Sequence, residues 1–379
     1  MLKAGIDISS VVYGRGVSRY TTNLVRSLLL KPEMQLSLYG TSLRQNKELT
    51  KIAQDLKKET GRKAHTVIRP HPPSLYTFLW NQLRYPGIRS VLKDIDIFHS
   101  WDWIQPPDKD LPLISTIHDL AILRYPETAH PKIVSMHQKS WQVLKDRKAH
   151  IIAVSRATKN DIVELLDIPQ ERIHVIHEAL PQEVPQTMNS MTEVRFEEIK
   201  LSLKLDKPFI FFVGTREPRK NLTRLIEAWQ ALANSEIELI IAGEAWEKGE
   251  EEKAVSGLRY LGRVSDEQLS VLYSEAAVFA YPSLYEGFGL PILEAFHHGT
   301  PVVTSNNSAL PEIAGNAAEL VDAESVDSIR FGLQTVLQES KTDQQKRLQR
   351  MIIRSQMFSW KRVAEQTMNA YTETIASMA

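Results

Sequence analysis

Glu286 and Glu294 lie on either side of a glycine-rich turn and a proline in the stretch LYEGFGLPILEAFHHGTPVV. Pro291 suits the first position of a helix, and Leu290 before it has no side chain that caps a helix. The first amides of such a helix are left to bind an anion, and the glycines let a ligand approach the backbone closely. We therefore expect a phosphate or diphosphate site at this turn.

The two carboxylates need a ligand of their own, because they would repel a bound phosphate. A carboxylate accepts two hydroxyl hydrogen bonds in a fixed geometry, which suits sugar hydroxyls. Glu286 would then hold a sugar on one side of the diphosphate, and Glu294 would hold a ribose on the other. The stretch therefore predicts a nucleotide-sugar site. The alternative is that Glu294 only complements the helix dipole and that Glu286 is an exposed loop acid.

A second stretch, GTREPRKN, places cations between an expected strand and an expected helix. Lys220 is the first candidate for neutralising a diphosphate leaving group, and Arg219 and Arg216 are further candidates. A run of charge on a solvated loop would look the same. The position after a strand favours a ligand, because parallel α/β sheets bind ligands beyond the carboxyl ends of their strands.

The N-terminal half carries two further motifs at expected strand ends. Gly14 and Gly16 in YGRGVSRY would let a ligand approach the backbone, although any tight turn uses glycine in the same way. His118 and Asp119 in TIHDL would contribute to sugar or acceptor binding. Asp119 would serve equally well as the cap of the following turn, and His99 in DIFHS is expected to be structural.

The elements that must position these residues alternate short β-rich runs with helical patterns in both halves of the chain. The runs include LKAGIDI, MQLSLYG, DIDIFHS, PLISTIHDL and HIIAVS, then FIFFVG, ELIIAG, VFAYPS and TPVVTS. This alternation is the signature of parallel sheets, so we expect an α/β fold of two doubly wound domains with the site in the cleft between them. A polar tract with two prolines after residue 180 predicts domains over 1–185 and 186–358, with a final helix in 359–379.

The composition suits a soluble two-domain protein, with 379 residues, 42% hydrophobic content and no cysteine. The lack of cysteine excludes disulfides and thiolate chemistry and agrees with a cytoplasmic location. Lys3 and Asp7 interrupt the place where a signal peptide needs an apolar core, and no apolar run approaches the roughly 20 residues of a membrane span.

Charge is unevenly distributed between the two halves. Residues 1–180 hold 26 of the 46 Lys and Arg residues and 18 of the 46 Asp and Glu residues. The first half would therefore suit an anionic ligand or an anionic surface, unless its cations are only solvated. No basic stripe with interleaved aromatic residues indicates nucleic-acid binding.

These motifs together resemble glycosyltransferase family 4, the retaining nucleotide-sugar transferases of GT-B fold. The resemblance spans nearly the whole chain, through YGRGVSRY, TIHDL, GTREPRKNL, RYLGRVSDEQLSVLYSEAAVFAYPS and EGFGLPILEAFHHGTPVV. It is most like the bacterial mannosyltransferases that extend O-antigen and capsular polysaccharide. It implies two Rossmann-like domains facing across a cleft, a GDP-mannose donor, and a C-terminal helix around Trp360 that crosses back onto the N-terminal domain.

The resemblance also implies roles for individual residues. It assigns Glu286 to the donor sugar, Glu294 to the ribose and Lys220 to the phosphates. Glu286, Lys220 and His118 would carry the catalytic step. Further donor contacts would come from Gly16, Arg219, Arg263, Val264, Phe288, Gly289 and Leu290, and acceptor contacts from His118 and Asp119.

The sequence departs from the family pattern in places. Thr215 stands where many relatives have an arginine, so Arg216 or Arg219 would have to supply the second phosphate cation. Glu178 in IHEAL replaces a usual Asn or Gly turn and has no assigned role. The tripeptide Asp94–Asp96 resembles a metal-binding DxD but runs into a strand, so we expect it to be chance and predict no essential metal or other cofactor.

Retention of the anomeric configuration by double displacement needs a carboxylate nucleophile, and the sequence offers no clear candidate. We therefore expect front-face attack, in which the leaving phosphate oxygen takes the acceptor's proton. Residues 75–93 mix aromatic and basic side chains, as a segment facing a lipid-linked acceptor or an anionic membrane would; a buried helix with a basic outer face explains them as well. A UDP-sugar donor, a GT-B phosphorylase or epimerase, and a non-catalytic nucleotide-sugar binding protein remain as alternatives.

Overall fold

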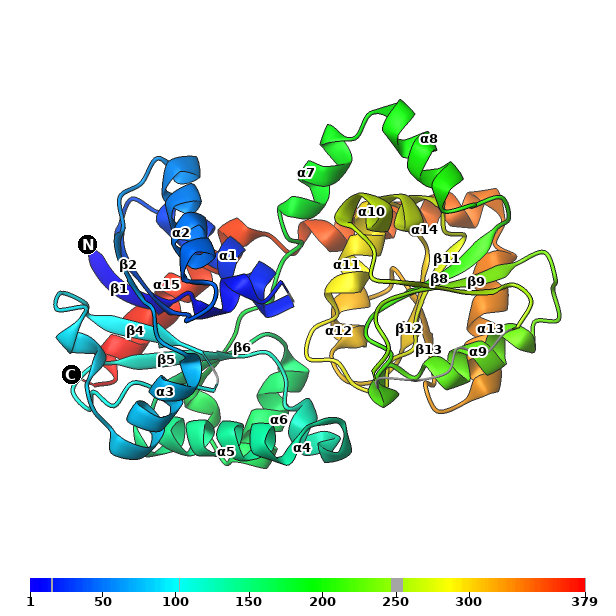
Figure 1. Cartoon of the computed structure of the whole chain (residues 1–379). Coiled ribbons are helices and arrows are strands. Elements are labelled where there is room, and N and C mark those ends of the chain that lie inside the picture. The colour runs from blue at the N-terminus through cyan, green and yellow to red at the C-terminus, as the bar shows by residue number, and fades with distance from the viewer. Residues whose placement is uncertain (15, 102, 247–254, 379) are drawn as a thin grey trace. The chain divides into compact units, whose positions relative to one another are not determined.

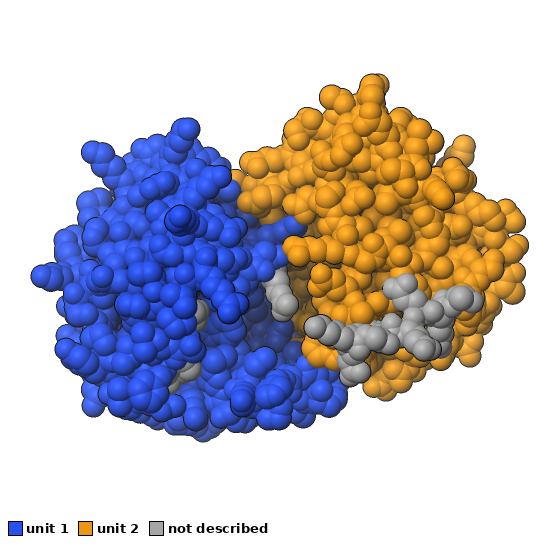
Figure 2. All heavy atoms as spheres, in the orientation of Figure 1, with its two compact units in different colours: residues 1–179, 359–379 blue, residues 180–358 orange. Residues whose placement is uncertain are grey.

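The computed structural model describes residues 1–14, 16–101, 103–246 and 255–378 (Figure 1). The chain forms two compact units: unit 1 comprises Met1–Ala179 with Ser359–Ala379, and unit 2 comprises Leu180–Phe358 (Figure 2). The polar tract after residue 180 belongs to unit 2 and forms two helices, α7 (Glu183–Ser190) and α8 (Glu193–Ser202). Its Pro185 falls in the first turn of α7, where proline leaves no intrahelical hydrogen bond unmade.

Unit 1 is built on a parallel sheet of seven strands in the order β3-β2-β1-β4-β5-β6-β7. Its strands are β1 (Leu2–Asp7), β2 (Met34–Thr41), β3 (His65–Arg69), β4 (Ile97–Ser100), β5 (Leu113–Ile117), β6 (His150–Ala153) and β7 (Ile173–Val175). Its helices are α1 (Gly16–Leu29), α2 (Asn46–Thr60), α3 (Pro73–Phe78), α4 (Ala121–Arg124), α5 (Pro131–Asp146), α6 (Arg156–Leu166) and α15 (Trp360–Ala376). The last of these packs on α1, β5 and β6.

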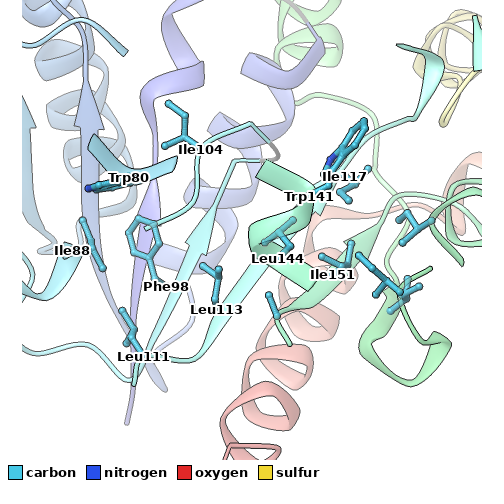
Figure 3. Packing of buried hydrophobic residues seen from close by; sticks show 14 of the residues in the cluster. Trp80, Ile88, Phe98, Ile104, Leu111, Leu113, Ile117, Trp141, Leu144 and Ile151 are labelled. Carbon is cyan, nitrogen blue, oxygen red and sulfur yellow. The ribbon is translucent and has the colours of Figure 1, made fainter. Parts of the chain in front are cut away.

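One hydrophobic cluster of the unit 1 core packs α5 against strands β4, β5 and β6. Trp80, Phe98 and Trp141 are among its largest side chains, and aliphatic residues from β5 and α5 fill the space around them (Figure 3). Strands β4 and β5 are buried at every position. Parallel strands covered on both faces have this pattern, and β5 accordingly holds only apolar residues and the small hydroxyl residues Ser115 and Thr116.

Unit 2 repeats the architecture with a parallel sheet of six strands in the order β10-β9-β8-β11-β12-β13. Its strands are β8 (Phe209–Val213), β9 (Glu238–Ala242), β10 (Leu258–Gly262), β11 (Val278–Tyr281), β12 (Val302–Ser305) and β13 (Glu319–Val321). Besides α7 and α8, its helices are α9 (Leu222–Gln230), α10 (Asp266–Glu275), α11 (Leu290–His297), α12 (Leu310–Ala314), α13 (Val326–Leu337) and α14 (Lys341–Gln356).

Each sheet has one point at which the order of strands reverses. In unit 1 this point lies between β1 and β4, and in unit 2 between β8 and β11. The loops that follow two such strands lead away in opposite directions, which opens a crevice at the carboxyl edge of the sheet. The sequence motifs that follow β1, β5, β8 and β11 therefore lie at or beside these two points.

Candidate active site

The loops after β8 and β11 meet at the switch point of unit 2. The short 3-10 helix Pro218–Lys220 ends the first loop, and the N–H of Leu284 in the second loop donates to the carbonyl of Arg219 at 2.7 Å. This backbone contact brings the phosphate-loop cations directly against the first glutamate of the opening motif. Nζ of Lys220 lies 2.6 Å from Oε1 of Glu286, and Nη1 of Arg219 lies 3.0 Å from Oε2.

Glu286 is a buried carboxylate between two cations rather than an exposed loop acid. Burial opposes its ionisation, but the charges of Lys220 and Arg219 outweigh this and lower the pKa of Glu286 to about 2. Tyr281 at the end of β11 adds to the cluster, because its hydroxyl accepts a hydrogen bond from Lys220 at 2.8 Å. Burial, together with the nearby Glu286, raises the pKa of Tyr281 well above its ordinary value.

The neighbouring arginines have different surroundings. Arg219 contacts Glu217 at 2.8 Å as well as Glu286 and the carbonyl of Tyr285. The guanidinium of Arg216 stacks over the ring of Tyr260, 4.8 Å from its centre. Arg219 is thus the residue that shares the Lys220 site, while Arg216 packs toward β10.

The sequence predicted Pro291 at the first position of a helix. Helix α11 begins one residue earlier, at Leu290, so Pro291 occupies its second position. Gly289 is the N-cap and has no side chain to cap the helix. Its φ of 111° favours glycine, and a Cβ there would lie 2.9 Å from the end of the Leu310 side chain. Phe288 is buried with its ring edge-on to Phe358 at 5.9 Å. The first amides of α11 therefore have no side-chain cap, as an anion site needs.

Glu294, one turn into α11, is buried and accepts a hydrogen bond from the hydroxyl of Tyr273 at 3.0 Å. His298 stacks on the same tyrosine and contacts the carbonyl of Glu294 at 2.8 Å. These contacts hold the second glutamate in place from within its own domain. The predicted donor contacts Arg263 and Val264 follow the edge strand β10.

His118 in unit 1 has a partner that the sequence did not indicate. Its Nδ1 lies 2.8 Å from Oε1 of Glu178, which is buried, and its ring meets the ring of Tyr20 edge-on at 4.7 Å. Asp119 caps the next turn by accepting the N–H of Ala121 at 2.8 Å. The structure therefore gives Asp119 a local structural role and leaves His118 as an imidazole fixed on one side by a carboxylate.

Three other sequence predictions concern unit 1. Gly14 has a φ of 64°, and Gly16 begins α1; a Cβ on either would meet no described atom within 4 Å, so Gly14 is required by its backbone conformation. Asp94 and Asp96 both bind Lys3, through its ammonium group at 2.8 Å and its backbone N–H at 2.9 Å. Within the described ranges, no group of three or more His, Asp or Glu side chains is arranged to hold a metal ion.

Comparison with known proteins agrees with this architecture. The model of Glycosyltransferase Family 4 matches residues 14–183, and that of Glycosyl transferases group 1 matches residues 194–354. Solved structures with the same fold include a glycosyltransferase from Rickettsia africae (TM-score 0.72, 15% identity, 99% of this chain and 98% of that one). Another is Anabaena Alr3699/HepE in complex with UDP and glucose (TM-score 0.67, 16% identity, full coverage of both chains). The fold is the GT-B fold of glycosyltransferases.

A curated relative extends the match through the whole chain. O-antigen chain mannosyltransferase B of Escherichia coli is 31% identical over 375 residues, which cover 94% of this chain and 95% of the relative. The MMP alpha-(1->4)-mannosyltransferase of Mycolicibacterium hassiacum is 30% identical over 244 residues, 60% of this chain and 55% of the relative. The chain belongs to glycosyltransferase family 4 and is a glycosyltransferase. None of its described helices is long and apolar enough to span a membrane.

Proposed function

We propose that this glycosyltransferase moves a mannosyl group from GDP-mannose to a saccharide or lipid-linked acceptor during synthesis of a cell-surface polysaccharide. The observation that carries the proposal is the buried cluster of Lys220, Arg219 and Glu286 at the switch point of unit 2. It combines cations for a diphosphate with a carboxylate for sugar hydroxyls. The mannosyl group and the polysaccharide are supported by the names of the relatives.

The same contacts support retention by front-face attack. Each oxygen of Glu286 faces a cation, and a carboxylate with a pKa of about 2 is a weak base and a weak nucleophile. In the proposed step the acceptor oxygen bonds to the anomeric carbon as the bond to the diphosphate breaks on the same face. The leaving phosphate oxygen takes the acceptor's proton, and Lys220, Arg219 and the α11 amides stabilise its charge. With these cations in place, we propose no essential metal.

Nucleotide binding tests the donor. In the absence of metal, GDP and GDP-mannose are expected to raise the melting temperature of the protein, because a ligand at a hundred times its Kd stabilises the folded state by about 2.7 kcal/mol. Glu294→Ala should abolish the shift by removing the ribose contact. UDP, ADP and their sugar conjugates serve as controls. A shift with UDP alone, the nucleotide present in the HepE complex, would replace the mannosyl donor with a UDP-sugar, and no shift with any nucleotide would contradict the proposed site.

We also propose that unit 1 contacts an anionic membrane surface through the segment around α3. Tyr76 and Trp80 are buried there, whereas Phe78, Leu83 and Tyr85 are exposed beside basic residues. Exposed apolar and basic side chains together favour an anionic bilayer. The protein is expected to sediment with phosphatidylglycerol vesicles more than with phosphatidylcholine vesicles, and Phe78→Ala with Tyr85→Ala should reduce this. Phe331→Ala, which removes an exposed aromatic side chain on α13, is the matched control; equal sedimentation of all variants would contradict membrane contact.

A further inference from the structure

The turn between β12 and α12 lies against the loop that carries Glu286. β12 pairs with β11 in parallel, so the loops that follow these two strands leave the same edge of the sheet as neighbours. The turn holds both backbone groups of Glu286: its N–H donates to the hydroxyl oxygen of Ser308 at 3.1 Å, and its carbonyl accepts the N–H of Ala309 at 3.4 Å. A third hydrogen bond joins the two loops, from the hydroxyl of Ser305 to the carbonyl of Ser283 at 2.6 Å. The turn therefore fixes the backbone from which the Glu286 carboxylate projects.

Ser308 has a backbone conformation that serine rarely adopts. Its φ is 49°, in the left-handed region, where a Cβ crowds the backbone and where glycine, asparagine and aspartate are usually found. In the described part of the chain seven residues other than glycine have a positive φ. Six of them lie within three residues of the end of a helix or helical turn, where such a residue commonly closes the last turn. Ser308 instead precedes a helix, since Ala309 is the N-cap of α12.

The hydroxyl of Ser308 gives a reason for the residue type. A glycine would adopt the left-handed conformation without strain, but it has no side chain to accept the N–H of Glu286. Ser308 is only partly buried, so the packing of the core does not require a serine there either. Strained backbone of this kind occurs preferentially at functional sites, where the surrounding structure holds it in place.

The position of the Glu286 backbone decides where its carboxylate lies. The two carboxylate oxygens face different cations, with Lys220 at 2.6 Å from Oε1 and Arg219 at 3.0 Å from Oε2. Charge-assisted hydrogen bonds of this kind depend on geometry, so a small rotation of the backbone would lengthen at least one of the two. The contact between Ser308 and Glu286 thereby affects both ion pairs.

We propose that Ser308 is a positioning residue for the transfer reaction, and that its hydroxyl fixes the backbone of Glu286 so that the carboxylate meets both cations and the donor sugar in one geometry. This role rests on the transferase function proposed above. Ser308 acts through Glu286 and needs no contact with the donor. The left-handed backbone at residue 308 is the conformation that brings the hydroxyl to the Glu286 N–H.

Three substitutions of Ser308 separate the effect of its hydroxyl from the effect of its strain. Ser308→Ala removes the hydroxyl and keeps a Cβ in the left-handed backbone, whereas Ser308→Gly removes the hydroxyl and relieves the strain. Ser308→Gly should melt about 2–4 °C above Ser308→Ala. Both should nevertheless lower kcat/KM by about tenfold, the effect of one lost hydrogen bond, with GDP-mannose as donor and α-mannobiose as acceptor. Ser308→Asn suits the left-handed conformation and keeps an acceptor, so it should recover part of the activity.

Ala233→Gly is the matched control for the relief of strain. Ala233 has a φ of 50° and follows α9. Glycine there should raise the melting temperature by a similar amount and leave kcat/KM unchanged. A second control tests the route through Glu286: in a protein that already carries Glu286→Gln, Ser308→Ala should have little further effect on kcat/KM, because both substitutions act on the same carboxylate.

The outcomes separate this proposal from the transferase function. If kcat/KM follows the melting temperature across the Ser308 variants, or if Ser308→Gly keeps the kcat/KM of the parent, then Ser308 serves only the fold and the positioning role is overturned, with the transferase function intact. A full tenfold loss from Ser308→Ala in the Glu286→Gln protein would overturn it as well. A parent protein that transfers no sugar from GDP-mannose would contradict the proposed function first, and this role with it.

Discussion

Replacing Glu286 with glutamine is expected to lower kcat/KM by a factor of about 10²–10³, the usual effect of removing one preorganised electrostatic contact from an active site. The substitution keeps the shape of the side chain but removes the charge that holds Lys220 at 2.6 Å and Arg219 at 3.0 Å. The two cations then repel each other and lose the orientation in which they would meet the diphosphate. Steady-state kinetics with saturating acceptor measures the loss.

The same variant should show a change in stability with pH. A pKa of about 2 in the folded protein, against 4.5 without the fold, means that ionised Glu286 stabilises the folded state by about 3 kcal/mol. This contribution is fully present above pH 4.5 and is lost as the pH falls toward 2. Glu286→Gln should therefore be less stable than the parent at neutral pH and should lose less stability on acidification over this range, as denaturant unfolding can measure.

Glu217→Gln is the matched control for Glu286→Gln. The carboxylate of Glu217 contacts Arg219 at 2.8 Å, whereas Lys220 donates its backbone N–H to the carbonyl of Glu217 at 3.0 Å, a contact that the substitution leaves in place. This variant is expected to retain kcat/KM within about tenfold of the parent, because the side-chain carbonyl of glutamine can still accept a hydrogen bond from Arg219 and Glu286 still holds both cations. Full activity of folded Glu286→Gln would contradict a role for the cluster in transfer.

Glu178→Ala is expected to lower kcat/KM by about 10- to 100-fold. The physical reason is the hydrogen bond from His118, worth about 1.5–3 kcal/mol when one partner is charged. Glu178 holds Nδ1 of His118 at 2.8 Å, which leaves Nε2 as the nitrogen that we expect to meet a ligand. Without it the imidazole can rotate and change tautomer. Glu178→Gln retains an acceptor and should recover part of the activity.

A double-mutant cycle distinguishes positioning from general structural support. If Glu178 acts only by orienting His118, then Glu178→Ala should have little further effect on kcat/KM in a protein that already carries His118→Ala. Equal losses in both backgrounds would show that Glu178 supports the fold and not the imidazole. Unfolding free energies measured on the same four proteins separate the two contributions.

The sequence predicted the fold because the composition of the strands and the residues that end them indicate the same elements. Runs such as FIFFVG and VFAYPS are short, apolar and followed by glycine or proline, and they form β8 and β11 as expected. The residues around Pro291 also predicted that α11 begins without a side-chain cap. The helix begins at Leu290, one residue before the predicted start. The domain junction was predicted at residue 185, whereas unit 2 begins at Leu180 and the polar tract after it forms α7 and α8. A proline in a first helical turn, such as Pro185, looks the same in sequence as a proline in a loop.

The pairing of side chains was much less predictable. The sequence assigned Lys220 to the phosphates and Glu286 to the sugar, but it did not predict that the two side chains contact each other. They come from different loops, which lie together because β8 pairs with β11 in the sheet. Glu178 was noticed as unusual, yet nothing in IHEAL indicates that it meets His118 from another loop. Tyr273 and Tyr281 look in the sequence like ordinary core aromatic residues. Only the structure shows that their hydroxyl groups contact the site residues Glu294 and Lys220.

The packing of α15 on unit 1 has a consequence for how the protein is made. Unit 1 consists of two stretches of chain, and the whole of unit 2 is translated between them. The hydrogen bond between His99 and Tyr371 joins residues 272 positions apart in the sequence, so it cannot form until α15 has been synthesised. On the ribosome, unit 2 can fold as one continuous stretch, while the surface of α1, β5 and β6 that α15 covers stays open until residues 360–376 emerge. Translation that stops before this helix would release a folded unit 2 joined to an incomplete unit 1.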